Sequence, residues 1–118
     1  MVAPLLLVAV LVASYSTLAP PAARVVIASG QGTIDYKGIR VNNYVYEPQA
    51  LSVKTGTTVT WVNEDSGTIH TVAGESSFFG SGNIRLGESF SFTFGDAGTY
   101  EYSCRVHPWM VGTVMVSS

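Results

Sequence analysis

The chain has 118 residues, which is enough for one domain with one modest core and too few for two. Charged residues make up 12% of the chain, about half the usual share in soluble proteins. The net charge is only −2, and the six Lys and Arg residues are scattered along the sequence. No basic patch therefore indicates nucleic-acid binding.

The N-terminal segment is the most apolar part of the chain. Residues 1–23 carry no charged side chain, and residues 2–13 form an unbroken apolar or small run, the length of a secretory signal core. Residues 2–19 approach the minimum for a membrane span, so an uncleaved anchor or tether is the alternative. A strand or core helix fits less well, because the run has no polar face. We expect export to the periplasm or to the outer face of the plasma membrane.

These features divide the chain into two parts. Residues 1–23 are predicted to be a signal peptide or membrane anchor with a short linker, and residues 24–118 the folded domain. Cys104 is the only cysteine, so an exported chain cannot use it for an internal disulfide. Its thiol must have another role, such as an intermolecular bridge, simple burial or metal ligation.

The first half of the domain has the pattern of short strands between turn residues. In residues 57–63, Val59, Trp61 and Asn63 share one face, which we expect to line the core. Residues 69–73 resume an apolar, β-branched pattern. The strands expected in this half are 25–28, 39–46, 50–54, 57–63 and 69–73.

The second half begins with an irregular stretch, residues 74–87, for which Phe78 and Phe79 are the expected anchors. Phenylalanine then alternates with polar residues over 89–94. A similar alternation over 99–104 places Cys104 on the inward face, and a last strand is expected at 112–117. Together these patterns predict an all-β Greek-key sandwich of seven or eight strands.

The main chemical signal follows the strand at 99–104. Cys104, His107 and Met110 form a C-x-x-H-x-x-M pattern of thiolate, imidazole and thioether, a soft donor set that favours copper. A mononuclear electron-transfer copper site also needs a second imidazole. The chain has two histidines, so that ligand can only be His70. The predicted metal ligands are therefore His70, Cys104, His107 and Met110.

Each of these residues also has a structural reading when it is taken alone. A single buried Cys behaves as a small hydrophobe, a single His is commonly hydrogen-bonded within a fold, and Met fills gaps in cores. The shared spacing and the histidine count favour the copper site over these readings. Four protein donors would leave no position for a substrate, which favours electron transfer over catalysis.

The sequence resembles the cupredoxins and, within them, the plastocyanin/amicyanin family. The resemblance is carried by residues 44–48, 51–56, 59–65, 70–72, 90–94, 98–104 and 107–114. The short C-x-x-H-x-x-M loop matches amicyanin rather than the longer loops of plastocyanin or azurin. The resemblance implies one type 1 copper ion, alternating between Cu(I) and Cu(II), bound by the four predicted ligands.

The resemblance also implies a function and a surface. The expected protein is a monomeric carrier of single electrons between a donor and an acceptor redox protein. Electrons would pass through the exposed edge of His107, within an apolar patch that includes Pro108 and Trp109. Copper storage or delivery through the same ligands is the alternative.

Three positions qualify this interpretation. Thr71 stands where many family members have Asn, so its backbone N–H can still bond the thiolate but the side-chain brace must differ. Arg105 would favour reduced copper if it pointed inward, and otherwise it is a solvated surface residue. Copper nitrite reductases and multicopper oxidases place histidines beside the type 1 cysteine. Here Ser103 and Arg105 flank Cys104, so no enzyme activity is expected.

Overall fold

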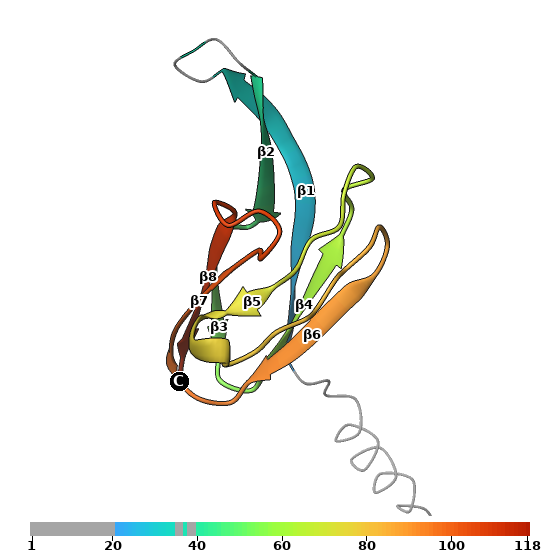
Figure 1. Cartoon of the computed structure of the whole chain (residues 1–118). Coiled ribbons are helices and arrows are strands. Elements are labelled where there is room, and N and C mark those ends of the chain that lie inside the picture. Colours follow the sequence, from blue (N-terminus) through green and yellow to red (C-terminus); the bar gives the residue numbers. More distant parts are fainter. Residues whose placement is uncertain (1–20, 35–36, 38–39) are drawn as a thin grey trace, which may run out of the picture.

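The computed structural model describes residues 21–34, 37 and 40–118, and these residues form an all-β structure (Figure 1). Its strands are β1 (Ala22–Ile34), β2 (Arg40–Glu47), β3 (Ala50–Lys54), β4 (Thr57–Asn63), β5 (Ala73–Gly74), β6 (Ser89–Phe94), β7 (Gly98–Ser103) and β8 (Val111–Ser117), with a single 3₁₀ turn η1 (Glu75–Ser77). The predicted all-β class and strand number are confirmed. The apolar segment 2–19 lies outside the described residues. Within the described part, no helix is long and apolar enough to cross a membrane.

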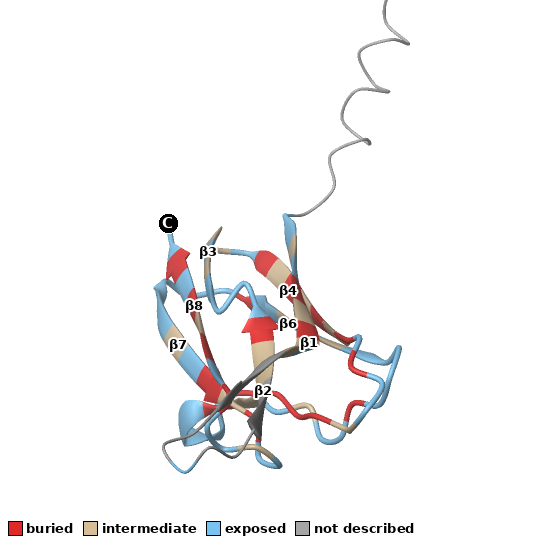
Figure 2. Ribbon diagram, turned by 90° about the horizontal axis from the view of Figure 1, so that it is seen from above, coloured by how far each residue is buried: buried red, intermediate tan, exposed pale blue. Residues whose placement is uncertain are grey.

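The strands form two four-stranded sheets, in the orders β2-β1-β4-β6 and β3-β8-β7-β5. Strand β1 pairs antiparallel with β2 and parallel with β4, and β3 runs parallel to β8. The buried positions recur along strands of both sheets, while the remaining positions of those strands are more exposed (Figure 2). The predicted two-sheet sandwich is therefore confirmed, with one core between the sheets.

Two strand predictions differ from the structure. Strand β1 continues beyond residues 25–28 because its pairing with β2 accommodates the glycines at a register shift between Gly30 and Thr33. It also begins at Ala22, within the predicted linker, because Ala22 pairs with Thr58 of β4. Residues 69–73 were expected to form a strand, but only Ala73 belongs to one.

The reason for the missing strand lies in the backbone donors of this segment. The N–H of Thr71 donates to the Cys104 sulfur at 3.3 Å, and the N–H of Val72 donates to the Ser81 hydroxyl at 2.8 Å. A ladder would need these N–H groups for backbone carbonyls of a neighbouring strand. Because side chains accept these two N–H groups in place of backbone carbonyls, the segment does not form a regular strand.

The core is built around Trp61 on β4. Val59, Trp61 and Asn63 are all buried, as the alternation in the sequence predicts. Of the two expected anchors, Phe79 is buried and stacks on Trp61 with ring centroids 5.8 Å apart. Phe78 is 53% exposed, so the prediction was wrong for this residue. The two rings stand nearly perpendicular, at 88°, and only one of them enters the core.

The site predicted from the sequence lies at one end of this sandwich. Cys104 immediately follows β7, and residues 104–110 connect β7 to β8. This connection lies at the end of the sandwich from which the hairpin of β1 and β2 projects (Figure 1). The segment between β4 and β5, which carries His70, reaches the same end.

Candidate metal centre

Cys104 is fully buried at the end of β7. Its backbone N–H donates to the carbonyl of Met110 at 3.1 Å, and the N–H of Met110 donates to the carbonyl of His107 at 2.9 Å. These two hydrogen bonds close residues 104–110 into a compact turn, which we call the ligand loop. The loop brings the side chains of Cys104 and His107 together and leaves Met110 buried.

His70 reaches the same point from a different part of the chain. Its backbone forms an isolated antiparallel bridge with Ile84, with the His70 N–H donating at 3.1 Å and the Ile84 N–H donating at 2.8 Å. The side chain of His70 is fully buried. The bridge fixes the backbone of His70, and its ring lies beside the ligand loop, with its centroid 4.9 Å from that of His107.

The donor atoms of the three residues converge. The Cys104 Sγ lies 3.9 Å from His70 Nδ1 and 3.7 Å from His107 Nδ1, and all three donor atoms lie within 4.8 Å of one another. Metal–sulfur and metal–nitrogen bonds of about 2.3 and 2.05 Å, the lengths seen for zinc, place two donors about 3.8 Å apart when they meet at 120°. The two sulfur–nitrogen distances therefore fit donors that could bind one metal ion together.

Thr71 connects the His70 segment to the ligand loop. Its N–H donates to the Cys104 Sγ at 3.3 Å, and its hydroxyl accepts the Arg105 N–H at 2.8 Å. The Tyr46 hydroxyl donates to the Thr71 carbonyl at 2.5 Å. Burial and the neighbouring Cys104 raise the pKa of Tyr46, so its phenol keeps the proton that it donates.

The prediction for Thr71 is therefore confirmed in both of its parts. The backbone hydrogen bond to the cysteine sulfur is present, and the brace between the two segments is a threonine hydroxyl instead of an Asn side chain. Arg105 is exposed, in agreement with its reading as a surface residue.

A buried carboxylate stands behind His70, on the far side of the ring from Cys104. The Asp65 Oδ2 lies 2.8 Å from His70 Nε2. The Asp65 Oδ1 accepts the Gly67 N–H at 2.9 Å and the Ser29 hydroxyl at 2.8 Å. Burial by itself would raise the pKa of Asp65, but the hydrogen bonds from His70, Gly67 and Ser29 lower it overall, so this carboxylate is ionised.

This geometry can be compared with known proteins. The model of the family described as copper binding proteins, plastocyanin/azurin family, matches residues 35–117, most of the chain. The chain belongs to this family. It is a cupredoxin, as the resemblance in the sequence predicted, and the family binds copper. His70, Cys104 and His107 are positioned to hold the metal ion.

The relatives agree on this assignment. Over 101 residues the chain is 37% identical to amicyanin from Paracoccus denitrificans, covering 81% of this chain and 72% of that protein. It is 36% identical to plastocyanin from Prochlorothrix hollandica, covering 97% and 91%. A solved structure of a purple cupredoxin from Nitrosopumilus maritimus matches with a TM-score of 0.67 and 34% identity, covering 80% of this chain and 99% of that one.

Sequence reasoning missed two residues that position the cupredoxin site. Asp65-Ser66-Gly67 carries the signature of a turn closed by an Asp side chain, and this hydrogen bond is present. The signature does not reveal that the second carboxylate oxygen faces a histidine. Asn63 was predicted only as a core residue. Its side chain accepts the Asp65 N–H at 2.8 Å and donates to the Ile84 carbonyl at 2.8 Å.

His107 lies nearer the surface than His70. Its ring centroid lies 4.3 Å from that of Tyr44 and 5.4 Å from that of Trp109. Burial and the nearby His70 lower the pKa of His107, although the negative Asp65 acts in the opposite direction. Tyr44 and Trp109 cover part of the His107 ring, and the residue as a whole is half-buried.

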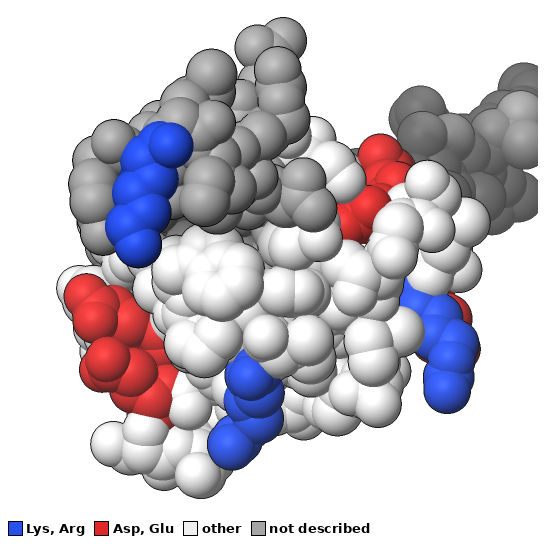
Figure 3. All heavy atoms as spheres, turned by 45° about the horizontal axis from the view of Figure 1, so that its top comes forward, with Lys and Arg blue, Asp and Glu red and all other residues white. Residues whose placement is uncertain are grey.

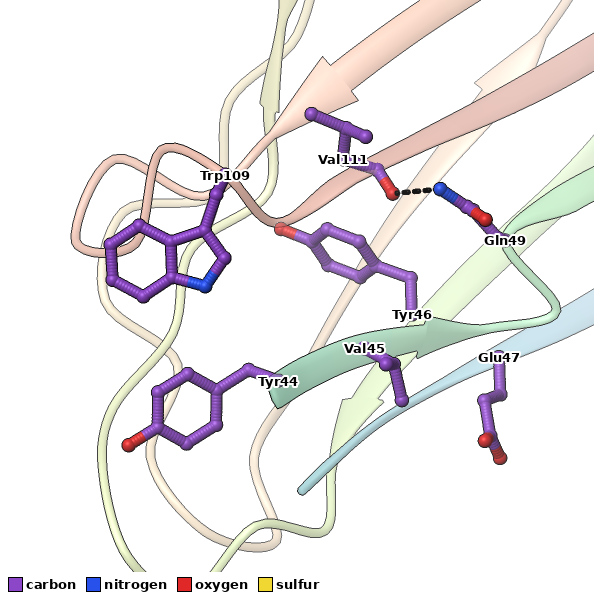
Figure 4. A pocket seen from close by; sticks show the side chains of 7 residues that line it. All are labelled: Tyr44, Val45, Tyr46, Glu47, Gln49, Trp109 and Val111. Atoms are coloured by element: carbon purple, nitrogen blue, oxygen red, sulfur yellow. Dashed lines mark hydrogen bonds between the residues drawn. The ribbon is translucent and has the colours of Figure 1, made fainter. Parts of the chain in front are cut away.

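Apolar side chains surround His107 at the surface. We call these residues the loop patch: Val106, Pro108, Trp109 and Val111, all exposed. The end of the molecule that Figure 3 brings forward is largely uncharged at its centre, with charged side chains around it. A surface pocket of about 370 Å³ lies beside the patch and is lined by Tyr44, Val45, Tyr46, Glu47, Gln49, Trp109 and Val111 (Figure 4).

Proposed function

We propose that this cupredoxin binds one copper ion through His70, Cys104 and His107, with Met110 as a fourth, weaker ligand, and carries single electrons between redox proteins. The observation that carries the proposal is the convergence of the three donor atoms within 4.8 Å at a largely buried point. Met110 is 2% exposed, and its backbone bonds both Cys104 and His107 within the ligand loop. This placement supports its role as the fourth ligand.

The protein's own contribution is to keep the donors in place. Copper bound here would supply a one-electron couple between Cu(II) and Cu(I). The bridge to Ile84 holds the backbone of His70, and the turn from Cys104 to Met110 holds the ligand loop. The N–H of Thr71 stabilises a thiolate at Cys104. A site held by these contacts changes little between oxidation states, which favours fast electron transfer.

The same arrangement argues against an enzyme. With Met110 as the fourth donor, the protein would fill the coordination positions of the metal and leave none for a substrate. Ser103 and Arg105 beside Cys104 offer no ligand for a second copper ion. The names of the relatives, amicyanin and plastocyanin, support a carrier function. Storage or delivery of copper remains the second candidate, to be separated by experiment.

The loop patch is the proposed docking surface for the electron donor and acceptor. Trp109 is 58% exposed and Val111 48% exposed, and the centroid of the Trp109 ring lies 5.4 Å from that of the partly open ring of His107. An apolar surface of this kind permits brief contact with more than one partner. We further propose that the domain acts as a monomer. Its proposed location is outside the cytoplasm, because the apolar N-terminal segment favours export.

The first experiment asks whether copper binds as a thiolate complex. The purified chain is mixed with Cu(II), and an intense visible charge-transfer band is expected that ascorbate bleaches and an oxidant restores. Replacing Cys104 by Ser removes the thiolate, so the variant should lack the band. A copper-loaded but colourless oxidised protein would refute the carrier function and favour storage or delivery.

The second experiment tests the loop patch without requiring a known partner. Electron self-exchange between reduced and oxidised copies is measured by NMR line broadening. Trp109→Glu places a negative charge beside His107 and should slow self-exchange at least tenfold while the visible band persists. Met115→Glu is the matched control, because Met115 is 38% exposed and pairs with Thr99, at the opposite end of β7 from Cys104. Equal rates in both variants would exclude the patch.

A further inference from the structure

The two histidines of the site differ in what lies behind their rings. His70 Nε2 faces the carboxylate of Asp65 at 2.8 Å, and both side chains are almost completely buried. His107 has aromatic neighbours, Tyr44 and Trp109, and a partly open edge. The buried carboxylate is therefore in direct contact with the site through His70.

Asp65 is held in a way that requires a carboxylate. Its three partners are the ring N–H of His70, the backbone N–H of Gly67 and the hydroxyl of Ser29. When the imidazole proton is on Nε2, all three can donate, and a carboxylate can accept from all of them. An amide would offer one oxygen and one NH₂ group, so at least one of these contacts would pair two donors.

Burying this charge is costly, and the fold compensates with contacts from distant segments. Ser29 lies on β1, 36 residues from Asp65. Asn63, at the end of β4, accepts the Asp65 backbone N–H. An isolated buried carboxylate would be strongly unfavourable, whereas one with three donors is tolerated. The arrangement keeps an ionised group at a point where a neutral acceptor could also have oriented the ring.

We propose that Asp65 is a positioning residue for the copper site: it holds the His70 proton on Nε2, leaves Nδ1 free for the metal, and lowers the reduction potential. The last effect follows from charge, because a buried anion stabilises Cu(II), with its extra positive charge, more than Cu(I). Carboxylates that accept from metal-bound imidazoles fix the tautomer and raise the basicity of the ligand. This inference rests on the proposed copper site.

The central experiment compares two neighbouring substitutions that remove the same charge. Asp65→Asn removes the buried carboxylate. Glu64→Gln removes an exposed one, which pairs with Arg24 at 2.7 Å and is screened by solvent. Spectroelectrochemical titration should show a higher potential for Asp65→Asn, with the ratio of Cu(II) to Cu(I) affinity lowered about tenfold, which is about 59 mV for one electron. Glu64→Gln should change that ratio less than twofold.

A second neutral variant is included in case Asp65→Asn fails to fold or to bind copper. Asp65→Ser is smaller than the native residue, and its hydroxyl can still accept a hydrogen bond. It should raise the potential in the same direction as Asp65→Asn. A potential equal to that of the native protein in the copper-binding variants would overturn the redox part of the proposal.

The tautomer is tested separately, on the metal-free native protein. Long-range ¹H–¹⁵N spectra at pH 8 should show the His70 proton on Nε2 and an unprotonated Nδ1. A proton on Nδ1 would overturn the positioning role. This measurement needs no copper. If the native protein gave no visible band, the proposed function would fail while the spectra still decided the role of Asp65 in orienting His70.

Discussion

The two segments that supply the candidate ligands are held in different ways. The segment from Glu64 to Ala73, which carries His70, is fixed by side chains from several other parts of the chain, including Ser29, Tyr46 and Ser81. The ligand loop is closed mainly by its own backbone, between Cys104 and Met110. His70 is accordingly buried, whereas the residues after Cys104 are largely exposed up to Met110.

This difference in support suggests that the His70 segment and the ligand loop have different roles. The His70 segment holds one donor and one buried charge in a fixed position. The ligand loop supplies the Cys104 sulfur and also presents His107 and the loop patch to solvent. Rigid support on one side and exposure on the other are both needed by a carrier that must keep its geometry and still meet a partner. Substitutions in the two segments should therefore have unequal effects.

The largest contrast is expected between the two histidines in the metal-free protein. His70→Ala leaves a cavity and a buried carboxylate without its main partner, which should lower the free energy of unfolding by about 3–5 kcal/mol. His107→Ala affects a partly exposed ring and should cost about 1 kcal/mol or less. Urea unfolding followed by tryptophan fluorescence measures both. Equal losses would show that the two segments are supported alike.

Asn63 should rank next, because it supports the His70 segment from β4. Asn63→Ala leaves the Asp65 N–H without its acceptor and removes one of the two donors to the Ile84 carbonyl, at a cost of about 1–3 kcal/mol in the free energy of unfolding. Thr60→Ala is the control on the same strand, since Thr60 bonds Ser91 at an exposed position, and it should change stability by about 0.5 kcal/mol or less. Thermal unfolding compares the two variants.

A smaller effect, dependent on pH, is expected for Tyr102 on the strand that leads into the ligand loop. Burial raises the pKa of Tyr102 to about 12, above its value of about 10 in an unfolded chain. Its contribution to stability is therefore complete below pH 10 and is lost as the pH rises from 10 towards 12. The loss should reach about 1 kcal/mol by pH 11.

Tyr102→Phe tests this assignment. The Tyr102 hydroxyl has no hydrogen-bond partner among the described residues, so the variant should stay within about 1 kcal/mol of the native protein at pH 7. Between pH 9 and 11 it should lose less stability than the native protein, while Tyr46 keeps its own contribution. If the stability of Tyr102→Phe fell between pH 9 and 11 as much as that of the native protein, Tyr102 would not ionise on unfolding as described.

The smallest effect concerns the link between the two segments. Thr71→Val removes the acceptor of the Arg105 N–H and should cost about 1 kcal/mol, whereas Thr71→Ser keeps that acceptor and should cost less. Both variants retain the backbone N–H that bonds Cys104, so the visible band should persist in both. Loss of the band in Thr71→Val but not in Thr71→Ser would show that the hydroxyl, and not only the backbone, shapes the site.

The sequence alone determined the fold class and the donor set. Alternation on β4, β6 and β7 predicts two-sided strands, and the inward register of β7 places Cys104 in the core. The close spacing of Cys104 and His107, with only one further histidine in the chain, predicts the three donors that the fold brings together. These inferences succeed because they depend on residues that are neighbours in sequence or on the period of a strand.

Only the tertiary structure decided how the donors are supported. Asp65 faces His70 because Ser29 of β1, Asn63 of β4 and the bridge to Ile84 fix the segment between them. Residues 70–72 look like a strand in sequence, but the N–H of Thr71 is taken by the sulfur of Cys104. These contacts join residues far apart in the chain, so no local pattern records them, and they become visible only when the sheets have brought the segments together.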